Sequence, residues 1–191
     1  TAPYGGAGIG GGRGGDGGTI TINGGTVTAT GNRNAAGIGG GREGSAGTIT
    51  INGGTITAYV GNDGAAAIGG GMYNRAGTVI INGGSIDEYA GSGAQGIGNG
   101  KNPIEETSVT NAAGDRVYLT RITLSGVTTR TAITSMTISA EYNIRDMKTN
   151  ADGRLHLFLP DGTTVTAVST SSKNYFGTVT TSSEIRANKI F

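Results

Sequence analysis

One short phrase returns four times in the first half of this sequence at an almost constant interval. The isoleucine of its Ile-Gly core stands at positions 9, 38, 68 and 97, so successive copies are 29, 30 and 29 residues apart. A fixed period of this length is typical of repeat architectures, in which each repeat buries its apolar side only by stacking on the next. The repeats therefore predict a solenoid, which we place over residues 1–102.

Each repeat also carries a second phrase with the pattern of a strand. Thr-Ile-Thr-Ile-Asn-Gly-Gly begins at Thr19 and Thr48, and Thr-Val-Ile-Ile-Asn-Gly-Gly begins at Thr78. Apolar residues alternate there with a period of two, and they alternate again over Thr26–Thr30. Three short strands per repeat predict an all-β fold, a short right-handed parallel β-helix whose coils stack about 4.8 Å apart.

Equivalent positions in successive repeats define columns that run down the stack. The inward columns are β-branched, as a packed pleated surface prefers. Asn23, Asn52 and Asn82 form another column beside the Gly-Gly corner. Stacked amides can hydrogen-bond to the coils above and below, so we expect a structural ladder there. The inward columns are Ile9/Ile38/Ile68/Ile97, Ile20/Ile49/Val79, Ile22/Ile51/Ile81 and Val27/Ile56/Ile86.

The outward columns hold the candidate ligand site. Tyr59 and Tyr89 are equivalent residues of adjacent repeats, and alternation along Thr55–Tyr59 directs them away from the core. Thr57 and Asp87 form a second column on the same face. Exposed aromatic rings beside hydrogen-bonding groups suit a sugar, because its ring face is apolar and its edge is polar. These four residues are the predicted ligand-binding site; the alternative is that the tyrosines stack across coils only for stability.

The second half of the chain has a different composition. Of the 39 glycines, 34 precede Lys101, which predicts a domain boundary at 102–103 and a second domain over residues 103–191. Pro160-Asp161-Gly162 predicts a turn, because proline fixes φ and glycine accepts a positive φ. Short strands between such turns predict a small β-sandwich that covers the open end of the solenoid. The candidate strands are Arg116–Leu124, Ile133–Ala140, Arg154–Leu159, Thr163–Val168 and Tyr175–Thr181, with Glu184–Ile190 as a sixth.

Two stretches resemble families of bacterial surface proteins. Residues 149–167, Thr-Asn-Ala-Asp-Gly-Arg-Leu-His-Leu-Phe-Leu-Pro-Asp-Gly-Thr-Thr-Val-Thr-Ala, resemble a phrase of prealbumin-like sandwiches, which include the B-type repeats of Gram-positive collagen adhesins. The Gly-Ile-Gly-Gly-Gly repeats look like those of large secreted or wall-attached proteins of Gram-positive and gut bacteria. The resemblance implies a prealbumin/Ig-like second domain and a secreted or cell-surface location. The adhesin family often carries a Lys–Asn cross-link; Lys148 and Asn188 are available for one, without matching sequence context.

Composition weighs against several classes of function. Charged residues are 14% of the chain and the net charge is +1, so we expect no nucleic-acid partner. Cysteine is absent, and no apolar run has the length of a membrane span, so we expect neither disulfides nor membrane insertion. Gly11–Asp16 matches the opening of a calcium-binding nonapeptide, but the next two repeats lack the aspartate. We expect no metal and no other cofactor.

These observations favour a non-catalytic surface module for adhesion or carbohydrate binding, with a glycan or an extracellular-matrix protein as its partner. Catalysis is not expected, because His156 is the one histidine and no nucleophile or metal cluster accompanies it. The main alternative is a passive stalk that displays other domains, which a flat and uniformly polar surface around the tyrosines would favour. An ice-binding threonine face and a polysaccharide-lyase-like enzyme are further alternatives.

Overall fold

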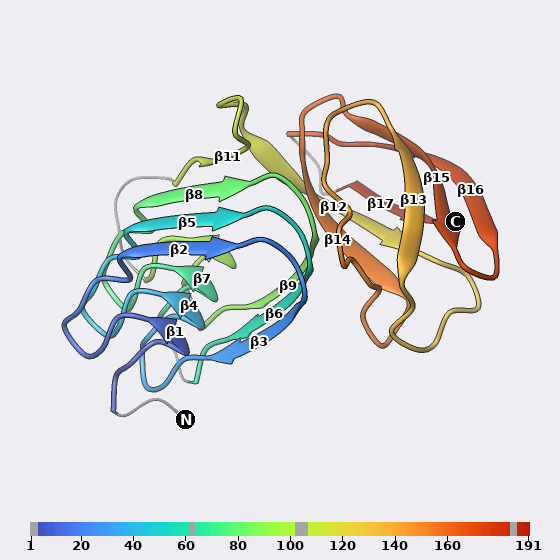
Figure 1. Ribbon diagram of the computed structural model, residues 1–191. Coiled ribbons are helices and arrows are strands. Elements are labelled where there is room, and N and C mark those ends of the chain that lie inside the picture. The colour runs from blue at the N-terminus through green and yellow to red at the C-terminus, as the bar shows by residue number, and fades with distance from the viewer. Residues whose placement is uncertain (1–3, 62–63, 102–106, 184–186) are drawn as a thin grey trace.

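The structure is a computed structural model that describes residues 4–61, 64–101, 107–183 and 187–191. Its N-terminal half is a parallel β-solenoid of about three turns, in which three sheets run along the stack (Figure 1). The first sheet is β1 (Ile9–Gly10), β4 (Ile38–Gly39), β7 (Ile68–Gly69) and β10 (Ile97–Gly98). The second is β2 (Thr19–Ile22), β5 (Thr48–Ile51), β8 (Thr78–Ile81) and β11 (Val109–Thr110), and the third is β3 (Thr26–Thr30), β6 (Thr55–Tyr59) and β9 (Ser85–Tyr89).

The register of these sheets is the one that the repeat period predicts. Ile9 pairs with Ile38, Ile38 with Ile68, and Ile97 with Ile68, all in parallel. Ile51 is fully buried in the core, as are most members of the inward columns. Exposure rises at the first coil, where Ile9 is 37% exposed because no coil precedes it in the structure. The predicted parallel β-helix is therefore confirmed.

Glycine is required where consecutive coils touch through their backbones. A β-carbon on Gly41 would overlap the carbonyl oxygen of Gly12 in the preceding coil. Gly47 has a φ of 75°, and a β-carbon there would overlap the carbonyl oxygen of Gly18. The glycine triplets thus serve coil stacking, which explains their recurrence at each repeat.

The asparagine column forms a continuous hydrogen-bonded ladder. Asn52 Nδ2 donates to Asn23 Oδ1 at 2.8 Å, and Asn82 Nδ2 donates to Asn52 Oδ1 at 2.8 Å. At the end of the column, the backbone N–H of Ala112 donates to Asn82 Oδ1 at 2.7 Å. The ladder therefore satisfies amides at the corner between the second and third sheets, as the sequence predicted.

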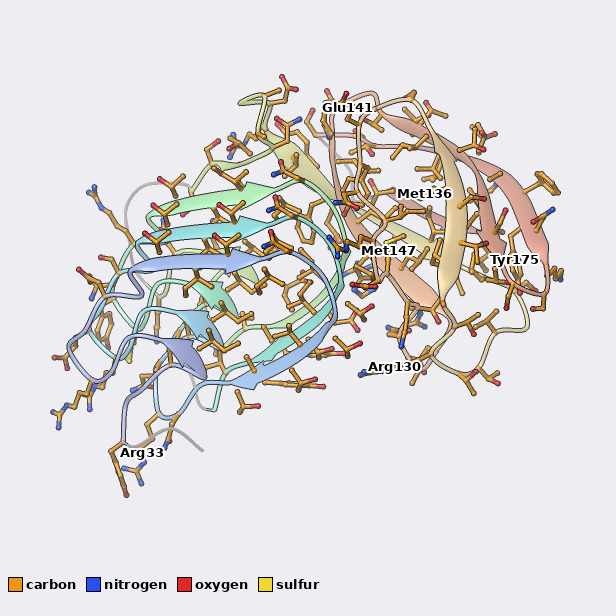
Figure 2. All side chains as sticks on the ribbon, in the orientation of Figure 1. Arg33, Arg130, Met136, Glu141, Met147 and Tyr175 are labelled. Atoms are coloured by element: carbon orange, nitrogen blue, oxygen red, sulfur yellow. The ribbon has the colours of Figure 1, made fainter. Side chains whose placement is uncertain are left out.

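The C-terminal half, residues 107–191, is built largely from two three-stranded sheets. In one, β12 (Val117–Thr123) lies between β14 (Arg154–Pro160) and β17 (Ala187–Ile190). In the other, β15 (Thr164–Thr170) lies between β13 (Ile133–Ile138) and β16 (Asn174–Thr180). Side chains of both sheets share one core, which contains Leu155, Leu157, Val165 and Met147, with Met136 packed against it (Figure 2). Each predicted strand of this half corresponds to a strand in the structure, although residues 184–186 of the sixth lie outside the described residues.

The two halves share buried surface. Val117, Leu119 and Phe158 belong to the same apolar cluster as the solenoid core, so the β12–β14 sheet packs against the last coil. The same sheet also lies along the side of the solenoid, where β14 contacts β9. Val109, although it follows the predicted boundary, pairs with Val79 in the solenoid. Residues 102 and 103, where we placed the boundary, lie outside the described residues.

Candidate functional site

The outer face of the third solenoid sheet is divided into a covered part and an open part. Thr55, Thr57, Ser85 and Asp87 point away from the solenoid core, yet each is 5% exposed or less. The equivalent threonines of the first coil, Thr26 and Thr28, are exposed. The C-terminal half therefore covers the second and third coils of this sheet, and it leaves the threonine side chains of the first coil exposed, although Asp146 Oδ2 accepts a hydrogen bond from Gly25 N of that coil at 3.0 Å.

One connecting segment of the C-terminal half, residues 142–148, makes much of this contact. Lys148 N donates to Thr55 Oγ1 at 2.8 Å, and Gly54 N donates to Arg145 O at 2.7 Å. Tyr142 Oη donates to Gly84 O at 2.6 Å, and Phe158 N donates to Tyr142 Oη at 3.3 Å. The segment is thus hydrogen-bonded to the solenoid at its Gly-Gly corners.

The two predicted tyrosines stand just beyond the covered part, at the ends of β6 and β9. Their rings stack with a centroid distance of 4.7 Å and an angle of 12° between planes. Tyr59 is 38% exposed and Tyr89 is 50% exposed. Burial, and then the nearby carboxylate of Asp87, raise the pKa of the Tyr89 hydroxyl. The pair is therefore a preorganised aromatic platform at the surface, with Tyr89 as its last ring along the stack.

Asp87 does not face solvent; it faces the single histidine. His156 Nδ1 lies 2.8 Å from Asp87 Oδ1, and these side chains are only 13% and 7% exposed. Although the two atoms are close, their geometry is not that of a regular hydrogen bond. The backbone N–H of His156 donates to Ser85 Oγ at 3.1 Å. A buried acid–imidazole pair thus joins the two halves of the molecule.

A groove opens beside this pair, between β9 and the β12–β14 sheet. Its volume is about 550 Å³. Its lining comes from both halves: Asp87, Glu88, Tyr89, Arg121, Thr123, Asn150, Asp152, Arg154, His156 and Ile190. Neither half forms this groove without the other.

The pairing of β12 with β14 explains which side chains reach the groove. Arg121 is opposite His156 and Thr123 is opposite Arg154 in the antiparallel register. Alternation places these residues on the face opposite Leu155 and its neighbours, which fill the core between the sheets. Further along the same face, Leu119 is opposite Phe158, and both pack on the solenoid core. One sheet face therefore has an apolar part that attaches it and a polar part that lines the groove.

The charges of the groove are unevenly compensated. Asp87 faces His156, and Arg154 Nη1 lies 3.8 Å from Asp152 Oδ2. The Glu88 side chain lies against Gly96 of the last coil. Arg121 is partly buried, and among the described residues its guanidinium has no ion-pair or hydrogen-bond partner. Arg121 is thus the cation of the groove without a counter-ion from the described part of the chain.

The four predicted site residues separate into two pairs. Tyr59 and Tyr89 lie together at the surface, as expected from their columns. Thr57 and Asp87 are 3% and 5% exposed, so the expectation that they lie open beside the tyrosines is wrong. The reason is that the C-terminal half covers the side of the solenoid as well as its end, which the sequence did not indicate.

Sequence reasoning missed Arg121, Arg154 and His156. The only signal was their position on the polar face of two strands whose other face is apolar, and that pattern does not identify the neighbour. Asp16, which ends the phrase that resembles a calcium-binding nonapeptide, accepts a hydrogen bond from Ser45 N at 2.7 Å through Oδ1, which is a contact between coils. In the described ranges, no group of three or more His, Cys, Asp or Glu side chains is arranged to hold a metal ion.

Comparison with known proteins gives a result for the solenoid alone. Residues 20–42 and 49–72 match the model of a family described as β-helix repeat. No curated protein and no solved structure gives a significant match. Within the described residues there is no helix long and apolar enough to cross a membrane. In these two stretches, the chain is similar to the β-helix repeat family.

Proposed function

We propose that this chain is a non-catalytic carbohydrate-binding module of a secreted or cell-surface protein, and that the glycan binds in the groove beside Tyr89. The stacked pair of Tyr59 and Tyr89 supports this proposal most directly, because it presents a fixed aromatic face next to a polar groove. A sugar ring packs its apolar face on such a platform and directs its hydroxyls to polar groups at the side. Asn150 and Thr123 line the groove and supply such groups.

The stacking of the tyrosines lowers the entropic cost of binding. Each ring is held by its neighbour at an angle of 12°, so little rotamer freedom remains to be lost when a ligand arrives. One aromatic contact contributes about 1 kcal/mol beyond its burial, so a single site binds weakly. Effective adhesion then depends on several copies acting together.

The non-catalytic part of the proposal is supported by the setting of His156. Its side chain is 13% exposed, and its Nδ1 faces Asp87 rather than the groove. We assign the pair a structural role at the junction of the two halves. We also propose that the two sheets of the C-terminal half form a prealbumin-like sandwich, which agrees with the shared core of the two sheets.

A glycan array of the folded chain tests the function, with heat-denatured protein as the control. The expected result is binding to a defined set of glycans that the Tyr59→Ala/Tyr89→Ala double variant loses while keeping its melting temperature. The matched control is Tyr73→Ala, since Tyr73 is 57% exposed and is not part of the groove lining. Unchanged binding by the folded double variant would place the site elsewhere.

A passive stalk is the second candidate, and the asparagine ladder favours it. Continuous hydrogen bonds along Asn23, Asn52 and Asn82 make the solenoid a stiff rod suited to holding other domains apart. An empty array, together with no binding to collagen or fibronectin, would favour the stalk over the binding module.

A further inference from the structure

We infer that the groove recognises an acidic sugar, and that Arg121 binds its carboxylate while Tyr89 packs on the sugar ring. This inference rests on the proposed carbohydrate function and specifies the class of sugar. It starts from the uncompensated cation of the groove. Arg121 is partly buried on the groove wall, and the described residues provide no partner for its guanidinium.

The other charged residues of the lining do not act as the counter-ion of Arg121. Asp87 is committed to His156 at 2.8 Å, and Asp152 lies 3.8 Å from Arg154. The side chain of Glu88 is directed against Gly96. A partly buried cation without a counter-ion is costly, and a ligand that brings the missing negative charge removes that cost.

The geometry of the guanidinium selects the type of anion. Its planar arrangement of N–H donors matches the two oxygens of a carboxylate, which binds through two parallel hydrogen bonds. A sulfate ester carries the same single charge but has three terminal oxygens, so the oxygen that the two parallel hydrogen bonds leave over needs a further donor. In the groove, the other arginine, Arg154, already lies near Asp152. The carboxylate of a uronic acid is therefore the group that fits.

Residues near Arg121 offer the other contacts that a sugar needs. Tyr89 and Thr123 line the same groove, the first with an aromatic face and the second with a hydroxyl. Ile190, which is 68% exposed, forms an apolar part of the lining. A hexuronic acid has a carboxylate, hydroxyls and an apolar ring face on one compact unit, so it meets all three surfaces.

Calorimetric titration of the full chain tests the inference with matched oligosaccharides. The probes are tetramers of galacturonate, of alginate and of hyaluronan, each compared with its own carboxyl-reduced form. We expect at least one acidic tetramer to bind about tenfold more tightly than its reduced partner. We expect Arg121→Gln to abolish that difference by weakening the binding of the acidic tetramer.

Two further variants distinguish a specific contact from general charge. Arg121→Lys keeps the charge but lacks the planar fork, so it is expected to lose most of the preference. Arg33→Gln removes an arginine at the far end of the solenoid (Figure 2) and is expected to change nothing. Melting temperatures of all variants show whether each is folded.

The outcomes separate the two proposals. Equal binding of acidic and reduced tetramers, or a preference that survives Arg121→Gln, overturns the assignment of Arg121 and leaves the carbohydrate function intact. Binding of sulfated but not of carboxylated glycans on the array also overturns it. Failure of every probe to bind, combined with an empty glycan array, overturns the proposed function as well.

Discussion

His156 Nδ1 lies 2.8 Å from Asp87 Oδ1, and the two side chains come from different halves of the molecule. Asp87 belongs to the last strand of the third solenoid sheet, and His156 belongs to the middle of β14. The contact fixes the position of one groove wall relative to the other. Groove geometry and the stability of the junction therefore depend on the same pair.

Removing one partner of this pair is expected to be costly. His156→Ala leaves the buried Asp87 carboxylate without its polar neighbour, which is expected to lower the free energy of unfolding by about 1–3 kcal/mol. The double variant Asp87→Ala/His156→Ala is expected to lose less than the sum of the two single variants, because neither partner is then left alone. Urea unfolding of all three variants measures both quantities. Strictly additive losses would show that the two side chains do not interact.

Core packing of the solenoid is tested on two residues of the same sheet. Ile51 is fully buried and Ile80 points outward from the neighbouring strand. Ile51→Ala is expected to cost about 2–5 kcal/mol, because it leaves a cavity between coils. Ile80→Ala is the control and is expected to cost under about 1 kcal/mol. Equal losses in chemical denaturation would contradict the assignment of the inward face.

The asparagine ladder predicts a difference between two identical substitutions. Asn52 donates to Asn23 and accepts from Asn82, whereas Asn23 acts within the ladder only as an acceptor. Asn52→Asp removes the N–H donor and leaves a carboxylate oxygen facing the acceptor Asn23 Oδ1. We therefore expect the free energy of unfolding to fall by about 1–3 kcal/mol. Asn23→Asp keeps the acceptor and is expected to cost a few tenths of that. Thermal unfolding at neutral pH compares the two variants, and equal losses would show that Asn23 also donates within the column, as in a ladder of the opposite direction.

Alkaline pH is expected to weaken the junction through Tyr142. Burial raises the pKa of its hydroxyl well above the ordinary value, although the hydrogen bond from Phe158 N lowers it somewhat. The folded state therefore holds this proton more tightly than the unfolded state. Its contribution to stability is complete below the ordinary pKa of about 10 and is lost as pH rises towards the higher folded-state pKa.

Tyr142→Phe isolates that contribution. The variant loses the hydrogen bond to Gly84 O, so we expect it to be about 1 kcal/mol less stable at pH 8. Between pH 9.5 and 11, its unfolding free energy is expected to fall less steeply than that of the unaltered chain. Parallel slopes in urea unfolding across this range would mean that Tyr142 does not titrate with unfolding.

The sequence predicted the parts of the fold that repeat. A constant period assigns each residue to a column. Ile38, Asn52 and Tyr59 therefore contact the equivalent residues of neighbouring coils, as predicted. The strands of the C-terminal half also followed from alternation and turns. The two-residue strand β11 was missed, because two residues carry no periodic signal.

The site was predictable only in part, because a repeat pattern describes contacts within the solenoid. It indicated that Tyr59 and Tyr89 stack outward, and they do. It contained nothing on the surface that covers Thr57 and Asp87, because that surface comes from residues about 60–100 positions later and has no repeat of its own. Arg121 and His156 became visible as groove residues only when the sheet face and the solenoid side were placed together.

The C-terminal half lies over the second and third coils of the third sheet, and the threonines of the first coil remain open. A repeat inserted ahead of β1 would therefore lengthen the molecule without altering the groove. Each insertion would move the groove outward by one coil spacing, about 4.8 Å. The number of repeats thus sets the reach of the groove, and reach can change in small equal steps while the chemistry of recognition stays the same.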